Sequence, residues 1–257
     1  MKFASVDFND FLSRIMKSGH DEEVYKILCN EYHQPADARL ALKEYKSSST
    51  SKRKDLMLGL AKNCTDGVRK YHGYSGEQVI LEALLSADLP NKWVHHILGG
   101  VENEEETYSL VQKFLSKEYA TAEVKNTSRS KSNIARLADF TVVKRGTFST
   151  QIISVDVKSN ESAFDYFLNQ ADDFSRFSDE IYLVATPELV LKEGKKKSGG
   201  ANSAEKAFTS TLKKHGVGLY VLDFSSQVIH KVMAANENKA DKHLKDKVLS
   251  ELGLRQR

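Results

Sequence analysis

Two aspartates and one lysine near the middle of the chain have residue types and spacing suited to chemistry on a phosphate. Asp139 precedes the hydrophobic segment FTVV, and Asp156 and Lys158 lie at the end of the next segment, QIISVDVK. Side chains alternate between the faces of a β-strand, so Asp156 and Lys158 are expected to share one face while Val157 turns into the core. A hairpin through KRGTFST would bring the Asp139 carboxylate to the same edge of the sheet. We therefore expect two carboxylates and one ammonium group to converge.

The hydrolysis of a phosphodiester near neutral pH needs an activated water and a counter-charge, and a hard divalent cation supplies both. Mg²⁺ prefers oxygen ligands and is typically held by one or two protein carboxylates together with substrate phosphate. Asp139 and Asp156 meet this requirement for Mg²⁺ or Mn²⁺. Lys158 could orient or deprotonate the attacking water, or stabilise the developing charge.

The same residues resemble the motif of the PD-(D/E)xK nuclease superfamily, which includes many restriction enzymes and Holliday-junction resolvases. The motif is an acidic residue, a variable spacer and then D/E-x-K, and it matches Asp139 and the triplet Asp156-Val157-Lys158. Ala138 stands where the family name has a proline. The resemblance covers the C-terminal part of the chain, from about residue 99.

The resemblance implies further site residues. Family members often carry an acid on the helix before the first core strand, and both Glu105 and Glu106 are open for this role, with Glu106 taken as the catalytic candidate. Many also carry a glutamine on the helix after the motif, where Gln170 stands. The main-chain carbonyl of Val157 is expected to complete the metal shell with Asp139 and Asp156.

The resemblance also implies an α/β fold, a restriction-endonuclease-like αβββαβ core with a mixed central sheet, preceded by an all-α N-terminal domain. Apolar spacing and β-type runs agree with this order of elements. The expected elements are helix 103–118, strands 119–125, 138–144 and 150–158, helix 161–177, strand 180–186, helix 203–215 and strand 216–223.

Three parts of the chain are expected. Residues 1–98 read as a helical N-terminal domain without strands, with Pro35 and Pro90 in first turns and Ser75 and Gln78 as a capping box. Residues 99–235 form the nuclease-like domain. Residues 236–257 include a C-terminal helix with a narrow apolar stripe, which could dock on the chain or support a homodimer.

Composition favours a soluble, cytoplasmic protein. The mean hydropathy is −0.47, and no apolar run is long enough to span a membrane. The start of the chain lacks the apolar region of a signal peptide. Cys29 and Cys64 are isolated, so neither a zinc site nor a disulfide framework is expected, and both are interpreted as buried thiols.

The net charge of +3 is small, so nucleic-acid affinity must come from local basic segments. Three are expected to be solvated loops: Lys46–Lys54, Lys192–Gly200 and Asn126–Arg136. The third leads into Asp139, and the second could close over a bound backbone. The candidate nucleic-acid contacts are Arg129, Lys131, Arg136, Lys195, Lys196 and Lys197.

The leading interpretation is a divalent-metal-dependent DNA endonuclease of restriction, defence or repair type. Two alternatives stay open. The motif residues could be solvated groups at strand ends, or the fold could be an inactive nuclease module that acts in nucleic-acid binding or assembly.

Overall fold

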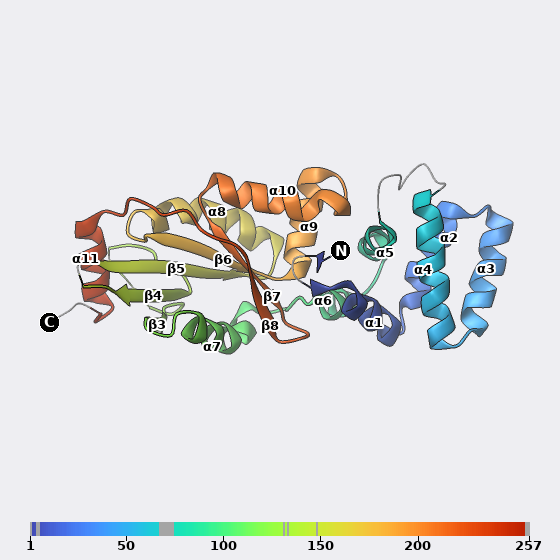
Figure 1. Cartoon of the computed structure of the whole chain (residues 1–257), viewed down its shortest axis with the longest axis horizontal. Coiled ribbons are helices and arrows are strands. Elements are labelled where there is room, and N and C mark those ends of the chain that lie inside the picture. The colour runs from blue at the N-terminus through green and yellow to red at the C-terminus, as the bar shows by residue number, and fades with distance from the viewer. Residues whose placement is uncertain are drawn as a thin grey trace.

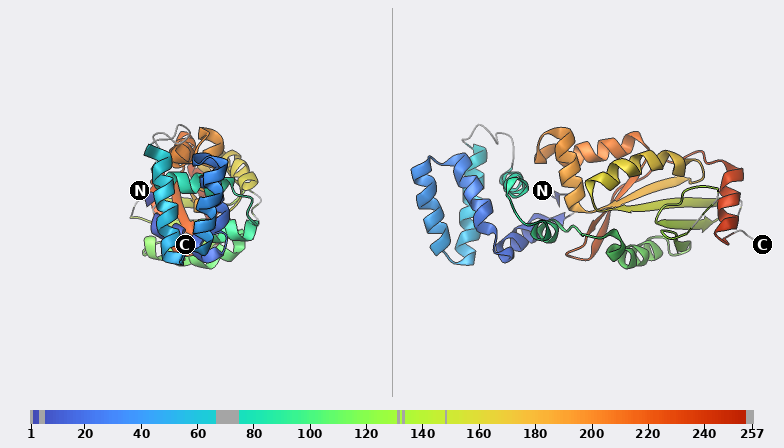
Figure 2. Two further views of the ribbon diagram at one scale, coloured as in Figure 1. Left: turned by 90° about the vertical axis from the view of Figure 1, so that its right-hand side faces the viewer. Right: turned by 180° about the vertical axis from the view of Figure 1, so that it is seen from behind.

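The computed structural model describes residues 2–3, 6–66, 75–130, 132, 134–147 and 149–254. These residues form an elongated mixed α/β molecule, with helices of the N-terminal part at one end and the last helix at the other (Figure 1). The same arrangement is seen from behind and end-on in Figure 2. Within the described residues, no helix is both long and apolar enough to cross a lipid bilayer.

The N-terminal part is mainly helical, as its apolar spacing predicts. Its helices are α1 (Phe8–Ser18), α2 (Asp21–Tyr32), α3 (Pro35–Ser47), α4 (Thr50–Asp66), α5 (Gly76–Ser86) and α6 (Asn91–Leu98). Ser75 and Gln78 form the predicted capping box at the start of α5. The expectation of a region without strands is wrong at its beginning, where β1 (Lys2–Phe3) pairs with β2 (Val6–Asp7) in a short hairpin.

The central element is a mixed sheet, as predicted, and it has six strands in the described residues. In the described residues its order is β3-β4-β5-β6-β7-β8. The strands are β3 (Glu123–Asn126), β4 (Phe140–Arg145), β5 (Thr150–Lys158), β6 (Glu180–Ala185), β7 (Gly218–Asp223) and β8 (Val228–Met233). The first three strands are antiparallel neighbours, β5, β6 and β7 run parallel, and β8 is antiparallel to β7.

Two apolar layers cover the sheet. The 3-10 helix η1 (Glu104–Thr107) and α7 (Tyr108–Glu118) precede β3, and α7 packs on one face, against Ile153, Val155 and Val157 of β5. Helices α8 (Glu161–Ser175), α9 (Pro187–Ser198) and α10 (Ala201–Lys214) pack on the other face (Figure 1). Because β5 alternates between these layers, Asp156 and Lys158 share the face opposite Val157.

Two of the three basic segments are not loops. Lys46–Lys54 contains the end of α3 and the start of α4, and most of Lys192–Gly200 is the last part of α9, a helix that the sequence interpretation missed. Lysine and arginine are good helix formers, so these segments continue their helices. Thr186 caps α9 and Pro187 is its first residue, a start signal that was available in the sequence.

The helical part and the sheet share one buried apolar cluster. Arg14 of α1 makes a bidentate ion pair with Asp223 at the end of β7, with distances of 3.1 and 2.6 Å. Gly99 has φ of 66° and lies so close to Asp223 that a side chain would collide with it. Lys195 of α9 pairs with Glu82 of α5 at 2.6 Å. The proposed boundary at residue 98/99 therefore crosses a packed contact and stays a prediction.

The C-terminal helix α11 (Lys242–Glu251) docks on its own chain. Its apolar residues Val248 and Leu249 are buried in the shared cluster, and Lys245 binds Asp179 at 2.7 Å. The apolar stripe that could have supported a homodimer is thus occupied within the chain. Cys29 and Cys64 are buried and not in a disulfide, as predicted, and burial raises the pKa of each thiol to about 11.

Candidate active site

The strand register brings the two predicted aspartates together. Phe140 of β4 pairs with Val155 of β5, which sets Asp139 beside Asp156 at the end of the hairpin. The main-chain N–H of Asp139 donates to Oδ1 of Asp156 at 3.2 Å, and the N–H of Val157 donates to Oδ2 of Asp139 at 2.8 Å. The side chains of Asp139, Asp156 and Lys158 therefore converge as the sequence predicts.

Lys158 is the centre of this group. Its Nζ lies 2.7 Å from Oδ2 of Asp156, 3.9 Å from Oδ2 of Asp139 and 3.7 Å from Oε2 of a third acid, Glu104. It also donates to the carbonyl of Val157 at 2.8 Å. Asp156 is 4% exposed and Lys158 8% exposed, so this ion pair is almost fully withdrawn from water, whereas Asp139 and Glu104 are partly exposed.

The upstream acid that reaches the site is Glu104 and not Glu106. Glu104 is the first residue of η1, and its Oε1 accepts from the N–H of Ser159 at 3.1 Å. Glu105 points to solvent and pairs with Arg129 at 2.7 Å, and Glu106 is exposed. The sequence shows three consecutive glutamates, and only the exact start of the helical turn decides which of them faces the sheet.

Tyr108 is a second residue that the sequence interpretation did not single out. It is the first residue of α7, and its hydroxyl donates to Oδ1 of Asp139 at 2.8 Å. Burial, followed by the negative charge of Asp139, raises the pKa of Tyr108, so the hydroxyl keeps its proton. Both oxygens of Asp139 are therefore oriented by donors, one from a side chain and one from the backbone.

The surroundings of Asp156 disfavour its charged form. Burial and the adjacent carboxylate of Asp139 raise its pKa to about 7, although Lys158 acts in the opposite direction. Its Oδ2 is buried and lies 2.7 Å from Nζ of Lys158, which is its charged partner among the described residues. A buried carboxylate is costly unless a cation pairs with it, and Lys158 provides that cation here.

Lys158 is protonated in this arrangement. Burial alone would lower its pKa, but the charges of Asp156, Asp139 and Glu104 outweigh burial and raise the pKa above its ordinary value. In the described residues, no three His, Cys, Asp or Glu side chains are grouped in a geometry that could by itself hold a metal ion. The three carboxylates are grouped around an ammonium ion.

A polar cleft of about 620 Å³ opens from this cluster. Its walls carry the hydroxyl side chains of the β3–β4 connection, together with Arg136, Tyr166 and Gln170. Gln170 is buried, and when its amide oxygen faces Arg136 it accepts from Nη2 at 3.1 Å. The predicted glutamine therefore holds an arginine in the cleft that the aspartates also line.

The candidate nucleic-acid contacts are distributed unevenly. Arg136 lies in the cleft, whereas Arg129 forms the exposed pair with Glu105, and Lys131 lies outside the described residues. The α9 lysines are held by their own chain: Lys195 pairs with Glu82, Lys196 lies 2.9 Å from Glu193, and Lys197 lies over the ring of Phe164. Of the candidates in the described residues, Arg136 alone reaches the cleft.

The chain was compared with protein-family models, with curated proteins and with solved structures, and none of these matches it.

Proposed function

We propose that this protein is a divalent-metal-dependent nuclease that hydrolyses phosphodiester bonds in DNA. The observation that carries the proposal is Asp156: a buried carboxylate with a raised pKa, beside Asp139 and Lys158 at the mouth of a polar cleft. Perturbed carboxylates in a cleft are typical of functional sites.

The order of elements supports a PD-(D/E)xK core. A helical segment (η1 and α7) is followed by three antiparallel strands, the helix α8 and the parallel strand β6. This is the αβββαβ order expected from the motif. Asp139 stands just before the second strand, and Asp156 and Lys158 end the third.

The residues fit a hard divalent cation. Asp139, Asp156 and Glu104 offer carboxylate oxygens, and the carbonyl of Val157 lies among them, hydrogen-bonded to Nζ of Lys158. Such oxygen donors suit Mg²⁺ or Mn²⁺. When bound there, the ion would polarise the phosphate and lower the pKa of a coordinated water.

The other side chains have distinct tasks in this proposal. Lys158 holds a proton and a positive charge where negative charge develops on the phosphate. Tyr108 fixes the orientation of the Asp139 carboxylate. Arg136, held by Gln170, offers a guanidinium to a phosphate in the cleft.

A second candidate function is a nucleic-acid-binding or assembly module without catalysis. One observation favours it: the ammonium group of Lys158 already lies among the three carboxylates, as it would in a purely structural ion cluster. A structural cluster and a catalytic site differ in whether a divalent cation can enter and in whether DNA is cut.

The test is incubation of the full-length protein with plasmid, linear and branched DNA in Mg²⁺ or Mn²⁺, with EDTA as the metal-free control. We expect cleavage that needs the metal and is lost in Asp156→Asn. Asp179→Asn is the matched control, because Asp179 also lies at the sheet but binds Lys245 at the far end of the domain. Cleavage that persists in Asp156→Asn, or no cleavage of any DNA, would contradict the nuclease proposal.

A further inference from the structure

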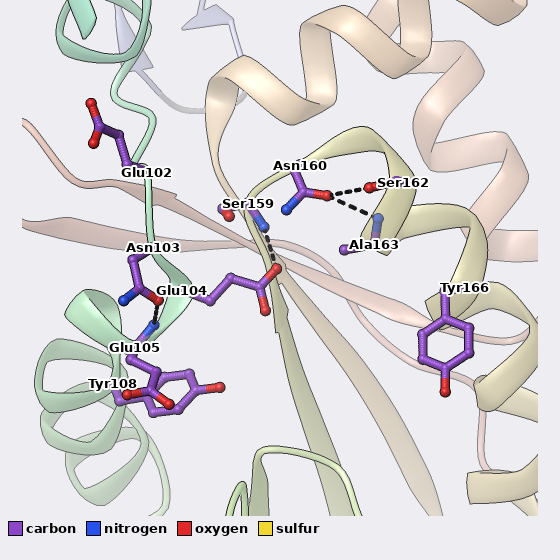
Figure 3. A pocket seen from close by; sticks show the side chains of 10 residues that line it. All are labelled: Glu102, Asn103, Glu104, Glu105, Tyr108, Ser159, Asn160, Ser162, Ala163 and Tyr166. Atoms are coloured by element: carbon purple, nitrogen blue, oxygen red, sulfur yellow. Dashed lines mark hydrogen bonds between the residues drawn. The ribbon is translucent and has the colours of Figure 1, made fainter.

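A second hollow lies directly beside the ion cluster. It has a volume of about 570 Å³ and is bounded by the residues before α7 on one side and by the start of α8 on the other (Figure 3). Glu104 lines it and also contacts Lys158, and Tyr166 lines both this hollow and the polar cleft. A group in this hollow would be adjacent to the phosphate at the reacting centre.

The side chains of this hollow do not suit a phosphate. Three glutamates line it (Glu102, Glu104 and Glu105), and its described lining contains no lysine or arginine. Lys158 and Arg129, which pair with Glu104 and Glu105, lie outside this lining, so the hollow offers a phosphodiester no cation, whereas an uncharged group with N–H donors would find acceptors. The other polar groups are amides and hydroxyls. Asn160 uses its Oδ1 to accept from Ala163 and Ser162, which leaves its amino group able to donate.

Tyr166 forms an aromatic wall of this hollow. Tyr166 is 48% exposed, which is unusual for a large aromatic side chain in this molecule. The guanidinium of Arg136 lies 4.6 Å from the centre of its ring and donates to its hydroxyl. Gln170 holds Arg136 from the buried side. Arg136 therefore fixes the ring from the side of the polar cleft. The ring also lines the hollow, whereas Arg136 does not.

We propose that this hollow receives an unpaired nucleobase next to the cleaved phosphodiester, with Tyr166 as the stacking surface. A base is uncharged, presents N–H donors to carboxylates, and stacks on aromatic rings. In this proposal Arg136 and Lys158 attract the DNA phosphates into the polar cleft. The base enters the neighbouring acidic hollow instead. The inference rests on the proposed nuclease function and narrows its substrate.

The substrate class that follows is DNA with an unpaired nucleotide at the cleavage position, such as a single strand, a flap or a branch. In an intact duplex the base is stacked and paired, and its removal costs energy that an unpaired base does not require. Duplex DNA is therefore the disfavoured substrate.

Binding is measured first, in EDTA, by the fluorescence anisotropy of three labelled DNAs: a duplex, the same duplex with a single-stranded flap, and the single strand. We expect the flap and single strand to bind at least about tenfold more tightly than the duplex. Tyr166→Ala should remove most of that preference, since stacking on an aromatic side chain is worth about tenfold or more per base. Tyr166→Phe, which keeps the ring, should retain it.

Leu40→Ala is the control, because Leu40 is also an exposed apolar side chain but lies on α3. Equal affinity for the three DNAs, no binding to any of them, or an unchanged preference in Tyr166→Ala would overturn the base pocket. Cleavage in Mg²⁺ is then measured separately. A binding preference without any cleavage would contradict the nuclease proposal but support the base pocket. Equal cleavage of duplex and flap would support the nuclease proposal but contradict the base pocket.

Discussion

Replacement of Asp156 by asparagine should make the stability of the protein less dependent on pH. Burial and the neighbouring Asp139 raise the pKa of Asp156 from its ordinary 3.8 to about 7 in the folded state. A folded pKa above the unfolded value means that the folded state holds the proton more tightly. This contribution to stability is fully present below about pH 4 and is lost as the pH rises through about 7.

The magnitude follows from these two pKa values. Between pH 5 and pH 8 the proton on Asp156 is lost, and at 1.36 kcal/mol per pKa unit the free energy of unfolding of the wild type falls by about 3 kcal/mol. Asparagine is neutral throughout this range. We therefore expect the free energy of unfolding of Asp156→Asn, relative to wild type, to rise by about 3 kcal/mol from pH 5 to pH 8.

Urea unfolding in EDTA at the two pH values measures this difference. For each protein the free energy of unfolding at pH 8 is compared with its own value at pH 5, so that any pH-independent effect of the asparagine side chain cancels. Asp179→Asn is the control. Asp179 accepts from the N–H of Ile152 at 2.6 Å and binds Lys245, so its replacement should lower stability at both pH values. A relative stability of Asp156→Asn that is flat or falls with pH would show that the charged Asp156–Lys158 pair stabilises the fold, and would refute the reasoning.

Three further substitutions test other parts of the structure. Lys158→Ala should lower the rate of DNA cleavage by about 100-fold or more. Lys158→Arg should not restore it, because a larger, planar guanidinium cannot take the place of a compact ammonium group among three carboxylates. A rate within a few-fold of wild type would remove Lys158 from the mechanism. Tyr108→Phe loses the hydrogen bond to Asp139 and should weaken Mn²⁺ binding about tenfold in calorimetry; unchanged affinity would mean that the backbone alone orients Asp139. Arg14→Ala leaves Asp223 buried without its cationic partner and should lower the free energy of unfolding by about 3 to 5 kcal/mol. Arg129→Ala, which removes an exposed ion pair, should lower it by less than about 1 kcal/mol. Equal effects of the two substitutions would contradict the packed contact between α1 and β7.

The central part of the site could be predicted from sequence because it depends on local rules. The alternation of side chains along β5 sets Asp156 and Lys158 on one face, and a hairpin returns Asp139 to the same edge. The apolar runs QIISV and IYLVA are also strong strand signals, and they occupy the buried centre of the sheet.

The remaining site residues depend on tertiary contacts that local patterns do not encode. Whether Glu104, Glu105 or Glu106 faces Lys158 depends on where η1 begins, and a shift of one residue changes the answer. The α9 lysines looked like a flexible basic loop because of their glycines. In the structure Gly194 lies inside α9, where the backbone of Ala204 leaves no room for a side chain, and Gly199 ends the helix.

The most direct test of the central claim is the titration of Mn²⁺ into metal-free protein by calorimetry at pH 8, with wild type and Asp156→Ala compared. The proposal predicts binding by wild type that is lost in the variant and that weakens as the pH falls below about 7, because the proton on Asp156 competes with the metal. Asp179→Asn should bind like wild type. Equal affinity in wild type and Asp156→Ala would contradict the assignment of this cluster as a metal-dependent nuclease site.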